Sequence, residues 1–330
     1  MSSAPFPWHR QQWQLLDDCR RQQRLPHSLL LTGAKGLGKT EFARQLAHSL
    51  LCQTAHEMGR PCGQCRNCQL MAAGSHPDHV WVEPAADKKA ITVDQIRELG
   101  QFLSLTAQAA GHKVVVIAPA EAMNVNAANS LLKTLEEPTA GSVLILVSHR
   151  PAMLTATIRS RCQHIRFTGS RDQAVVDWLN GQLDATQDCG LLLSLADGAP
   201  LIAREMADKD WVAARLQCLS DLEQLAAKGE DPIVVGQRWE DGGLRRGLTL
   251  MDSWITDMIR LKTAHPPPLL TNSDIASRLQ VLAARLPIIV LFRQLDRVNE
   301  ALRRLDGNFN PLLIAEEIMI GWADCFRDAA

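Results

Sequence analysis

The chain lacks a surplus of positive charge. Its 35 lysine and arginine residues stand against 36 aspartate and glutamate residues, which leaves a formal net charge of −1. A protein that binds nucleic acid on its own usually carries a basic excess, because it must neutralise phosphates. No stripe of alternating basic and aromatic residues is present either. These absences argue against a freestanding DNA-binding module and leave open only a local basic patch.

Long hydrophobic runs are also lacking. The longest apolar stretches, such as LPIIVLF from Leu286, are far too short to cross a bilayer. The first residues, MSSAPFPWHR, do not show the charged-then-apolar pattern of a secretory signal. We therefore expect a cytoplasmic protein with no membrane partner. At 330 residues, 46% of them apolar, the chain has the size and composition of two or three ordinary globular domains.

A third absence concerns an acid next to a phosphate-binding loop. Residues 33–40 read GAKGLGKT, in which Gly33, Gly36 and Gly38 let backbone N–H groups cradle phosphates at a helix N-terminus. In such loops the lysine, here Lys39, reaches the terminal phosphates, and the hydroxyl, here that of Thr40, binds Mg²⁺. Hydrolysis also needs a carboxylate at the end of a neighbouring strand.

The strand that should provide this carboxylate is KVVVI from Lys113, and Ala118 and Pro119 follow it. Neither side chain carries an oxygen. Glu121 lies beyond the helix-breaking proline, which makes it a poor substitute for a strand-end ligand. We expect the loop to hold ATP or ADP without hydrolysing it. The alternative is an inherited loop that serves only helix packing and binds no nucleotide.

Four of the nine cysteines crowd into one short segment. Cys62, Cys65 and Cys68 form CxxCxxC, and Cys52 precedes them. In a reducing compartment this pattern indicates a metal rather than disulfides, and four thiolates complete the tetrahedral shell of a structural Zn²⁺. Catalysis by this zinc is disfavoured, because no open coordination position or general base is evident. His76 could compete as the fourth ligand, and unliganded thiols are the alternative.

Short β-rich runs alternate with amphipathic segments between Ser28 and Phe167. The runs are SLLLT, HVWVE, KVVVI, SVLILV and QHIRF, and the alternation predicts a parallel sheet covered by helices. Thr92 and Gln95 have the spacing of a capping box before a helix. The helix that contains ANSLLKTLEEP should bury its leucines, Leu131, Leu132 and Leu135, and expose charged residues.

Helical spacing replaces the strand pattern after Gly169. Ser170 can cap one helix, another follows from Leu191, and long amphipathic stretches continue from Asp208, interrupted by HPPPLL at His265. The sequence therefore predicts an α/β domain over residues 1–168 with a zinc-binding insert at 52–68. A small helical domain should cover 169–207, and an all-α domain 208–330.

Four segments resemble the delta-prime family of bacterial DNA polymerase III clamp loaders, within the AAA+ class. They are LPHSLLLTGAKGLGKT at Leu25, CGQCRNCQLMAAGSHPD at Cys62, NAANSLLKTLEEP at Asn126 and TIRSRCQHIRF at Thr157. The resemblance implies an AAA+ P-loop parallel-sheet domain, a helical lid domain and a C-terminal helical collar for oligomerisation. It also favours Cys52 as the fourth zinc ligand.

The resemblance implies a subunit of a hetero-oligomeric ring with delta and gamma or tau subunits. Such a ring uses ATP to open the sliding clamp and place it around primed DNA, which the subunit meets through the assembled complex. Arg161, within Ser-Arg-Cys, would then act in trans as an arginine finger on the γ-phosphate of a neighbouring subunit. The alternative is that Arg161 caps a carbonyl or pairs with an acid in its own domain.

Two further positions compare with the active members of this family. Leu201 stands where the resemblance implies a phosphate-sensing arginine in the lid, while Ser148 keeps the polar position after the fourth strand. Lys133 could meet a phosphate or a neighbouring subunit, or could simply be solvated.

The leading hypothesis is a rigid end subunit, or stator, that also helps to bind the clamp. The rivals are an autonomous AAA+ ATPase, a zinc-containing DNA-binding module, and a small-molecule P-loop kinase, for which no substrate pocket is evident.

Overall fold

The structure is a computed structural model that describes residues 5–54, 60–109, 111–184, 187–207, 211–264, 270–305, 307 and 309–327. The chain forms two compact units. The first comprises Met1–Gln182 with Gly198–Ile202, and the second comprises Leu183–Asp197 with Ala203–Ala330. Residues of the predicted lid, 169–207, occur in both units. The domain boundaries proposed from the sequence stay predictions.

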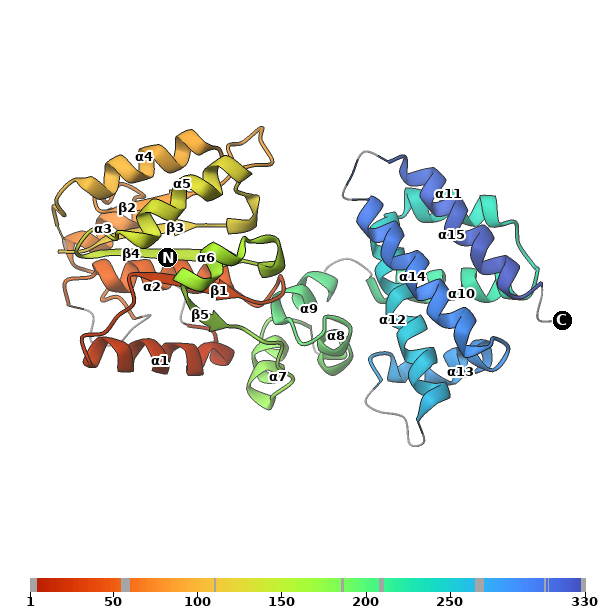
Figure 1. Ribbon diagram of the computed structural model, residues 1–330. Coiled ribbons are helices and arrows are strands. Elements are labelled where there is room, and N and C mark those ends of the chain that lie inside the picture. Colours follow the sequence, from red (N-terminus) through yellow and green to blue (C-terminus); the bar gives the residue numbers. More distant parts are fainter. Residues whose placement is uncertain are drawn as a thin grey trace. The chain divides into compact units, whose positions relative to one another are not determined.

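A five-stranded parallel sheet forms the centre of the first unit, in the order β2-β3-β4-β1-β5 (Figure 1). Each strand coincides with one of the runs predicted from sequence: β1 Ser28–Thr32, β2 His79–Val82, β3 Lys113–Ile117, β4 Ser142–Ser148 and β5 Gln163–Arg166. β1, β3 and β4 are buried along their whole length, which explains their nearly unbroken apolar sequences.

Helices cover both faces of this sheet, with α4 and α5 above the strands and α1 and α2 below them in Figure 1. Alternate strand residues, among them Leu30, Val115 and Leu144, pack with α4, α5 and α6 in one apolar cluster. The helices of the unit are α1 Arg10–Arg21, α2 Lys39–Leu51, α3 Arg66–Ala72, α4 Val93–Ser104, α5 Val125–Glu136, α6 Ala156–Arg161 and α7 Gln173–Asn180. Its 3₁₀ turns are η1 Pro7–His9, η2 Ala120–Ala122 and η3 Pro151–Met153.

Two helix N-termini were predicted from sequence, and the structure confirms the one at α4 but not the one at α7. The predicted capping box of Thr92 and Gln95 begins α4. The predicted cap of α7 at Ser170 is wrong, because that helix begins two residues later, after Asp172. The Ser170 hydroxyl instead accepts a hydrogen bond from the Asp172 N–H at 3.1 Å, so it forms a turn before the helix.

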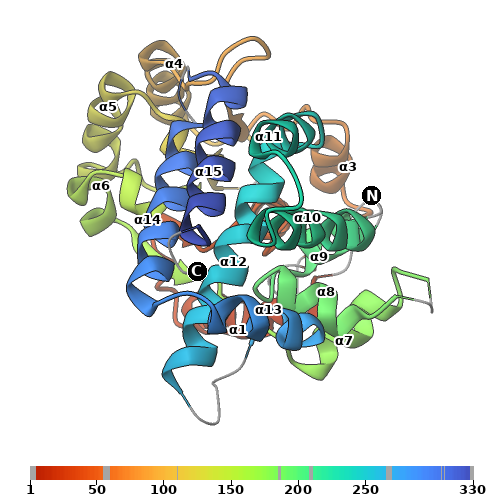
Figure 2. The ribbon, with the colours of Figure 1, turned by 90° about the vertical axis from the view of Figure 1, so that its right-hand side faces the viewer.

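The second unit is helical throughout its described residues, as the sequence predicts. Its elements are α8 Cys189–Leu195, most of α9 Pro200–Ala207, α10 Trp211–Ala226, α11 Pro232–Asp241, α12 Leu244–Thr263, η4 Ser273–Ile275, α13 Ala276–Ala284, α14 Ile288–Arg304 and α15 Pro311–Cys325. α11 packs along α15 and α12 along α14 (Figure 2), around buried Trp254 and Trp322. The predicted loop at Pro266, Pro267 and Pro268 lies outside the described residues.

Among the described residues, no single helix is long and apolar enough to cross a membrane. One helix pair, Ser273–Ala284 with Ile288–Arg304, reaches the required length and composition together, but it is bent by 115°.

Candidate functional site

The phosphate-binding loop connects the buried strand β1 to helix α2, which begins at Lys39. Gly36 and Gly38 have φ angles of 82° and 79°, in the left-handed region that favours glycine. A Cβ at position 36 would also lie 2.3 Å from the Ile202 side chain. Among the described residues, no backbone N–H from 35 to 39 donates to a carbonyl in the turns and loops. The loop therefore keeps the donors that an anion requires.

Two carbonyl groups of the loop accept hydrogen bonds from other segments of the chain. The Leu37 carbonyl accepts hydrogen bonds from the Trp8 indole at 3.1 Å and from the buried His9 ring at 2.7 Å. The Gly36 carbonyl accepts the Leu201 N–H at 3.1 Å. Burial lowers the pKa of His9 to about 4, so its ring is neutral and contributes no positive charge near pH 7. These contacts fix the loop without covering its N–H donors.

Lys39 lies inside this loop and is 1% exposed. Its ammonium donates a hydrogen bond to the Ala34 carbonyl at 2.5 Å. Burial lowers the pKa of Lys39 to about 8, and the negative charge of Glu121 opposes that shift. Lys39 is therefore largely cationic at neutral pH, with its charge directed at its own loop.

Glu121 lies closer to this site than its sequence position indicated. The short turn η2 brings the chain back toward the sheet, and one Glu121 carboxylate oxygen accepts the His149 N–H at 2.9 Å. The other oxygen is buried and has no partner among the described residues. The fully buried Ser148 hydroxyl is also without a partner there. An acid and a hydroxyl thus lie near Lys39 at the carboxyl edge of the sheet.

Ala118, Leu201 and Thr40, the other residues that the sequence singled out, also lie near this end of the sheet. β3 ends before Ala118, which is buried, and Pro119. Leu201 lies beside the loop with an aliphatic side chain, so it provides no guanidinium for a phosphate. Thr40 is the second residue of α2 and is half-buried. Among the described residues, the strand-end position next to the loop therefore carries no acid, and position 201 carries no arginine.

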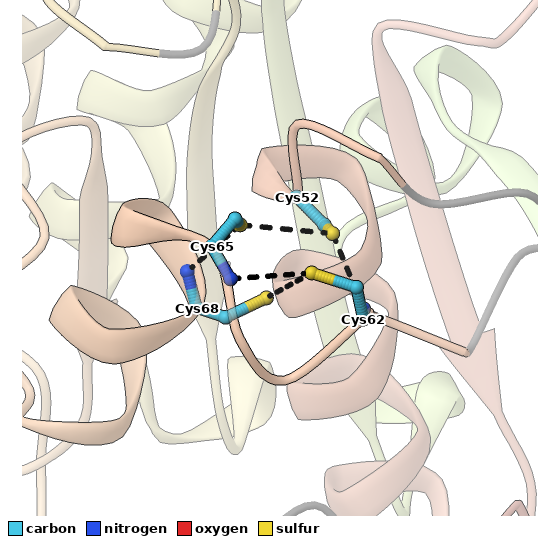
Figure 3. A group of neighbouring side chains, drawn as sticks. All are labelled: Cys52, Cys62, Cys65 and Cys68. Atoms are coloured by element: carbon cyan, nitrogen blue, oxygen red, sulfur yellow. Dashed lines mark hydrogen bonds between the residues drawn. The ribbon is translucent and has the colours of Figure 1, made fainter.

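The four predicted metal ligands come together at the far end of α2. The Sγ atoms of Cys52, Cys62, Cys65 and Cys68 all lie within 4.8 Å of one another and point toward a common centre (Figure 3). The Cys52–Cys65 and Cys62–Cys68 sulfur pairs are 4.0 and 3.8 Å apart. In a tetrahedron with Zn–S bonds of about 2.3 Å, the sulfur atoms are about 3.8 Å apart. The cluster could therefore hold a metal, and His76 is not part of it.

Backbone N–H groups donate hydrogen bonds to these sulfur atoms, which favours the thiolate form that binds a cation. The Cys62 N–H donates to the Cys52 sulfur at 3.3 Å, and the Cys65 N–H donates to the Cys62 sulfur at the same distance. A hydrogen bond from Thr54, followed by the N–H groups of Cys65 and Gln64, lowers the pKa of Cys62 to about 5. Burial raises the pKa of the Cys68 thiol, and binding of a metal would favour its thiolate form.

The cluster is distant from the phosphate-binding loop. Lys39 begins α2 and Cys52 directly follows its last residue. A helix of this length, 13 residues, extends about 20 Å. A metal held by the cysteines is therefore too far from bound phosphate to polarise it. This distance and the all-cysteine donor set fit a structural role.

Arg161 occupies the opposite edge of the sheet from Lys39. It ends α6, and only Cys162 separates it from β5. Its carbonyl accepts a hydrogen bond from the Ser28 hydroxyl, at the start of β1, at 2.8 Å. The Arg161 guanidinium contacts the Glu136 carboxylate at 2.6 Å and donates to the Thr157 carbonyl at 3.1 Å. Its side chain is 35% exposed. Both contacts that the sequence left as the alternative, a carbonyl and an acid, are therefore present.

Glu136 is the last residue of α5, which contains the motif ANSLLKTLEEP up to this residue. Leu131 and Leu135 are buried, and Leu132 packs partly buried against the same cluster, so the predicted core face of this helix is confirmed. Lys133 is exposed. Sequence reasoning did not place Glu121 near Lys39 or Glu136 beside Arg161. No local sequence signal pairs Glu136 with Arg161, because the two residues belong to different helices, α5 and α6.

Comparison with known proteins identifies the family. Residues 8–171 match the model described as DNA polymerase III, delta subunit, and residues 209–324 match its C-terminal counterpart. The delta′ subunit of DNA polymerase III from Pseudomonas aeruginosa is 34% identical over 322 residues, which are 96% of this chain and 97% of that protein. The chain belongs to the DNA polymerase III delta′ family. The family predicted from sequence is confirmed.

Other relatives extend the delta′ assignment. The delta′ subunit from Escherichia coli is 30% identical over 321 residues, 95% of this chain and 94% of that protein. The tau subunit of Bacillus subtilis DNA polymerase III is 31% identical over 200 residues, 59% of this chain and 35% of that protein. The predicted fold class, a parallel-sheet α/β domain with helical regions after it, is also confirmed.

Proposed function

We propose that this delta′-family chain is a clamp-loader stator that donates Arg161 to the ATP site of a neighbouring subunit and does not hydrolyse ATP itself. Its partners would be delta and gamma or tau subunits, the sliding clamp, and primed DNA reached through the assembled complex. The family membership supports the place in a DNA polymerase III complex, and the arrangement of the two edges of the sheet supports the division of labour.

One observation carries the proposal: Arg161 and Lys39 belong to opposite edges of the sheet. The Arg161 backbone is bonded to Ser28, at the first residue of β1, while the phosphate-binding loop follows the last residue, Thr32. Four steps along a strand are about 13 Å. Arg161 therefore cannot serve its own loop, and any phosphate that it stabilises belongs to another chain.

The loss of hydrolysis follows from the metal ligands. Thr40 offers one side-chain oxygen for Mg²⁺, but the side chains of Ala118 and Pro119 offer none at the end of β3. Residual binding of ATP or ADP remains compatible with the loop, because Gly33, Gly36 and Gly38 keep its N–H donors accessible. A nucleotide bound here would stabilise the loop conformation and would not be hydrolysed.

The cysteine cluster would hold one structural Zn²⁺, which joins the end of α2 to α3. Asn67, nearly fully buried in α3, already donates a hydrogen bond to the Leu51 carbonyl at 2.9 Å. The metal would add a tetrahedral crosslink to this contact.

The C-terminal helices would form the collar. Apolar side chains that a monomer would normally bury are exposed on α14 and α15: Ile289, Phe292, Leu313 and Ile320. Such a surface is suited to subunit association, and association in a replication complex agrees with a cytoplasmic location.

The test is ATP turnover by the reconstituted loader that contains Arg161→Ala. Arginine fingers contribute around 10³ to 10⁵ in rate, so turnover at the one facing site should fall to near zero and total turnover should fall by the share of that site. Arg159→Ala, two residues earlier on the same helix and exposed, is the matched control. Unchanged turnover with Arg161→Ala would defeat the proposal.

An autonomous ATPase is the second candidate, and Glu121 favours it. Its carboxylate lies near Lys39, where an acid could hold Mg²⁺ or orient water. Steady-state ATP turnover by the isolated chain, with and without Glu121→Gln, separates the two functions. The stator predicts no turnover in either, whereas Mg²⁺-dependent turnover abolished by Glu121→Gln would establish the enzyme.

A further inference from the structure

The contact between Arg161 and Glu136 joins two elements that are separate in sequence. Glu136 is the last residue of α5 and Arg161 is the last residue of α6. The guanidinium lies 2.6 Å from the carboxylate, and a second nitrogen donates to the Thr157 carbonyl. The side chains of Arg161 and Glu136 are 35% and 49% exposed. The pair is thus well formed, yet both charges remain in contact with solvent.

A guanidinium that already holds a carboxylate is a weaker partner for phosphate. The carboxylate occupies one of the donor directions that a phosphate would use, and its negative charge opposes the arrival of another anion. An exposed ion pair is weak, because water and salt screen it. Arg161 can therefore leave Glu136 at little cost.

From this geometry we infer that Glu136 is a positioning residue that holds Arg161 within its own domain until a neighbouring subunit presents a γ-phosphate. This inference rests on the proposed function of Arg161 and adds its regulation. The phosphate replaces the Glu136 carboxylate on the guanidinium, and Glu136 returns to solvent. No covalent bond changes in this exchange.

The exchange predicts a measurable competition. In the reconstituted loader, Glu136→Gln removes the competing charge but keeps the size and shape of the side chain. The ATP concentration that gives half-maximal turnover at the facing site should fall about two- to fivefold, the range that exposed ion pairs provide. ADP lacks the γ-phosphate, so its affinity should not change. A merely structural role of Glu136 would not separate the two nucleotides.

Glu137→Gln is the matched control, because it removes an equal charge from the next, exposed residue. It should leave the half-saturating concentrations of both nucleotides unchanged. In an Arg161→Ala background the facing site no longer turns over, so equilibrium binding of a fluorescent ATP analogue replaces turnover as the readout. Glu136→Gln should leave this affinity unchanged there, since the residue that it restrains is gone. Persistence of the effect in that background would overturn the inference.

The failure of this inference differs from the failure of the proposed function. If Arg161→Ala lowers turnover but Glu136→Gln leaves the half-saturating ATP concentration unchanged or raises it, Glu136 does not restrain Arg161 and the proposed function stands. If Arg161→Ala leaves turnover unchanged, both are wrong. Circular dichroism of each variant verifies that the exposed substitutions leave the fold intact.

Discussion

The two edges of the sheet each hold a cation near a carboxylate, but in different environments. At the carboxyl edge, Lys39 is 1% exposed and is influenced by Glu121. At the amino edge, Arg161 is 35% exposed and pairs with Glu136. A buried charge is expensive to move and sensitive to its neighbours, whereas an exposed one is cheap to exchange. We therefore expect Lys39 to keep its contacts at the carboxyl edge, and Arg161 to exchange its partner at the amino edge.

Helix α2 connects these edges. It begins at Lys39 in the phosphate-binding loop and ends directly before Cys52 in the cysteine cluster. A structural metal at the second end would fix the helix that supports the first. Cys52 lines one pocket with His27 and Gly141, which directly precede β1 and β4, so the cluster lies near the amino ends of these strands.

The largest expected effect comes from removing the metal ligands. The double variant Cys65→Ser and Cys68→Ser should lower zinc content from one per chain to near zero. Structural zinc sites bind with apparent free energies on the order of 10 kcal/mol, so the stability of this region should fall by several kcal/mol. Elemental analysis and thermal unfolding measure both quantities. Cys19→Ser, on α1, is the control and should keep the metal. Wild-type protein with far less than one zinc would remove this part of the proposal.

The second effect concerns the buried lysine. Because the folded-state pKa of Lys39 is about 8 and its ordinary value is 10.5, the folded chain binds this proton less tightly than the unfolded chain does. Burial of this charge therefore lowers the free energy of unfolding. The full destabilisation is present below pH 8, and it disappears as the pH rises from about 8 to 10.5. It amounts to about 3 kcal/mol.

Denaturant unfolding of the wild type and Lys39→Met between pH 7 and 10 measures this effect. The wild type should gain stability relative to Lys39→Met over that range. A constant difference would mean that Lys39 is not desolvated, and the contrast between the two edges would be lost.

A smaller effect is expected from Glu121→Gln. Loss of this negative charge should raise the affinity of the isolated chain for Mg²⁺-free ADP severalfold, or on the order of 1 kcal/mol, because a carboxylate near the loop repels phosphate. Equilibrium binding of a fluorescent ADP analogue tests this, with Lys39→Ala as the variant that should bind weakly. Lower affinity of Glu121→Gln for Mg²⁺-bound nucleotide would instead make Glu121 a metal ligand.

The smallest expected effect concerns the stability contributed by the ion pair at the amino edge of the sheet. Glu136→Gln should change the free energy of unfolding by less than about 1 kcal/mol, because exposed ion pairs contribute little. Urea unfolding of this variant beside Glu137→Gln measures the difference. A loss of several kcal/mol would show that the pair with Arg161 is structural, contrary to the exchange proposed for it.

Much of the fold was predictable, because strands buried on both faces have distinctive sequences. KVVVI and SVLILV could hardly form other elements between turn signals, and the leucines of α5 followed helical spacing. The start of α7 was not predictable in detail, since Ser170 and Asp172 are both plausible helix-capping residues and only the local turn decides between them.

The candidate site was predictable where local spacing determines it. CxxCxxC brings three sulfur atoms together within one short segment, and GAKGLGKT forms its loop from consecutive residues. Glu121 and Glu136 were not assigned, because their roles depend on tertiary contacts with His149 and Arg161. For Glu121 the sequence argument was misleading: a proline after a strand indicates departure from the sheet, but η2 returns the chain to it.

The most direct test compares two variants in one assay, the ATP turnover of the reconstituted loader. With Arg161→Ala in this chain, we predict loss of turnover at the facing site, and with Lys39→Ala we predict turnover equal to that of the wild type. Loss of turnover with Lys39→Ala, together with normal turnover for Arg161→Ala, would contradict the central claim that this chain supplies an arginine and not an ATPase site.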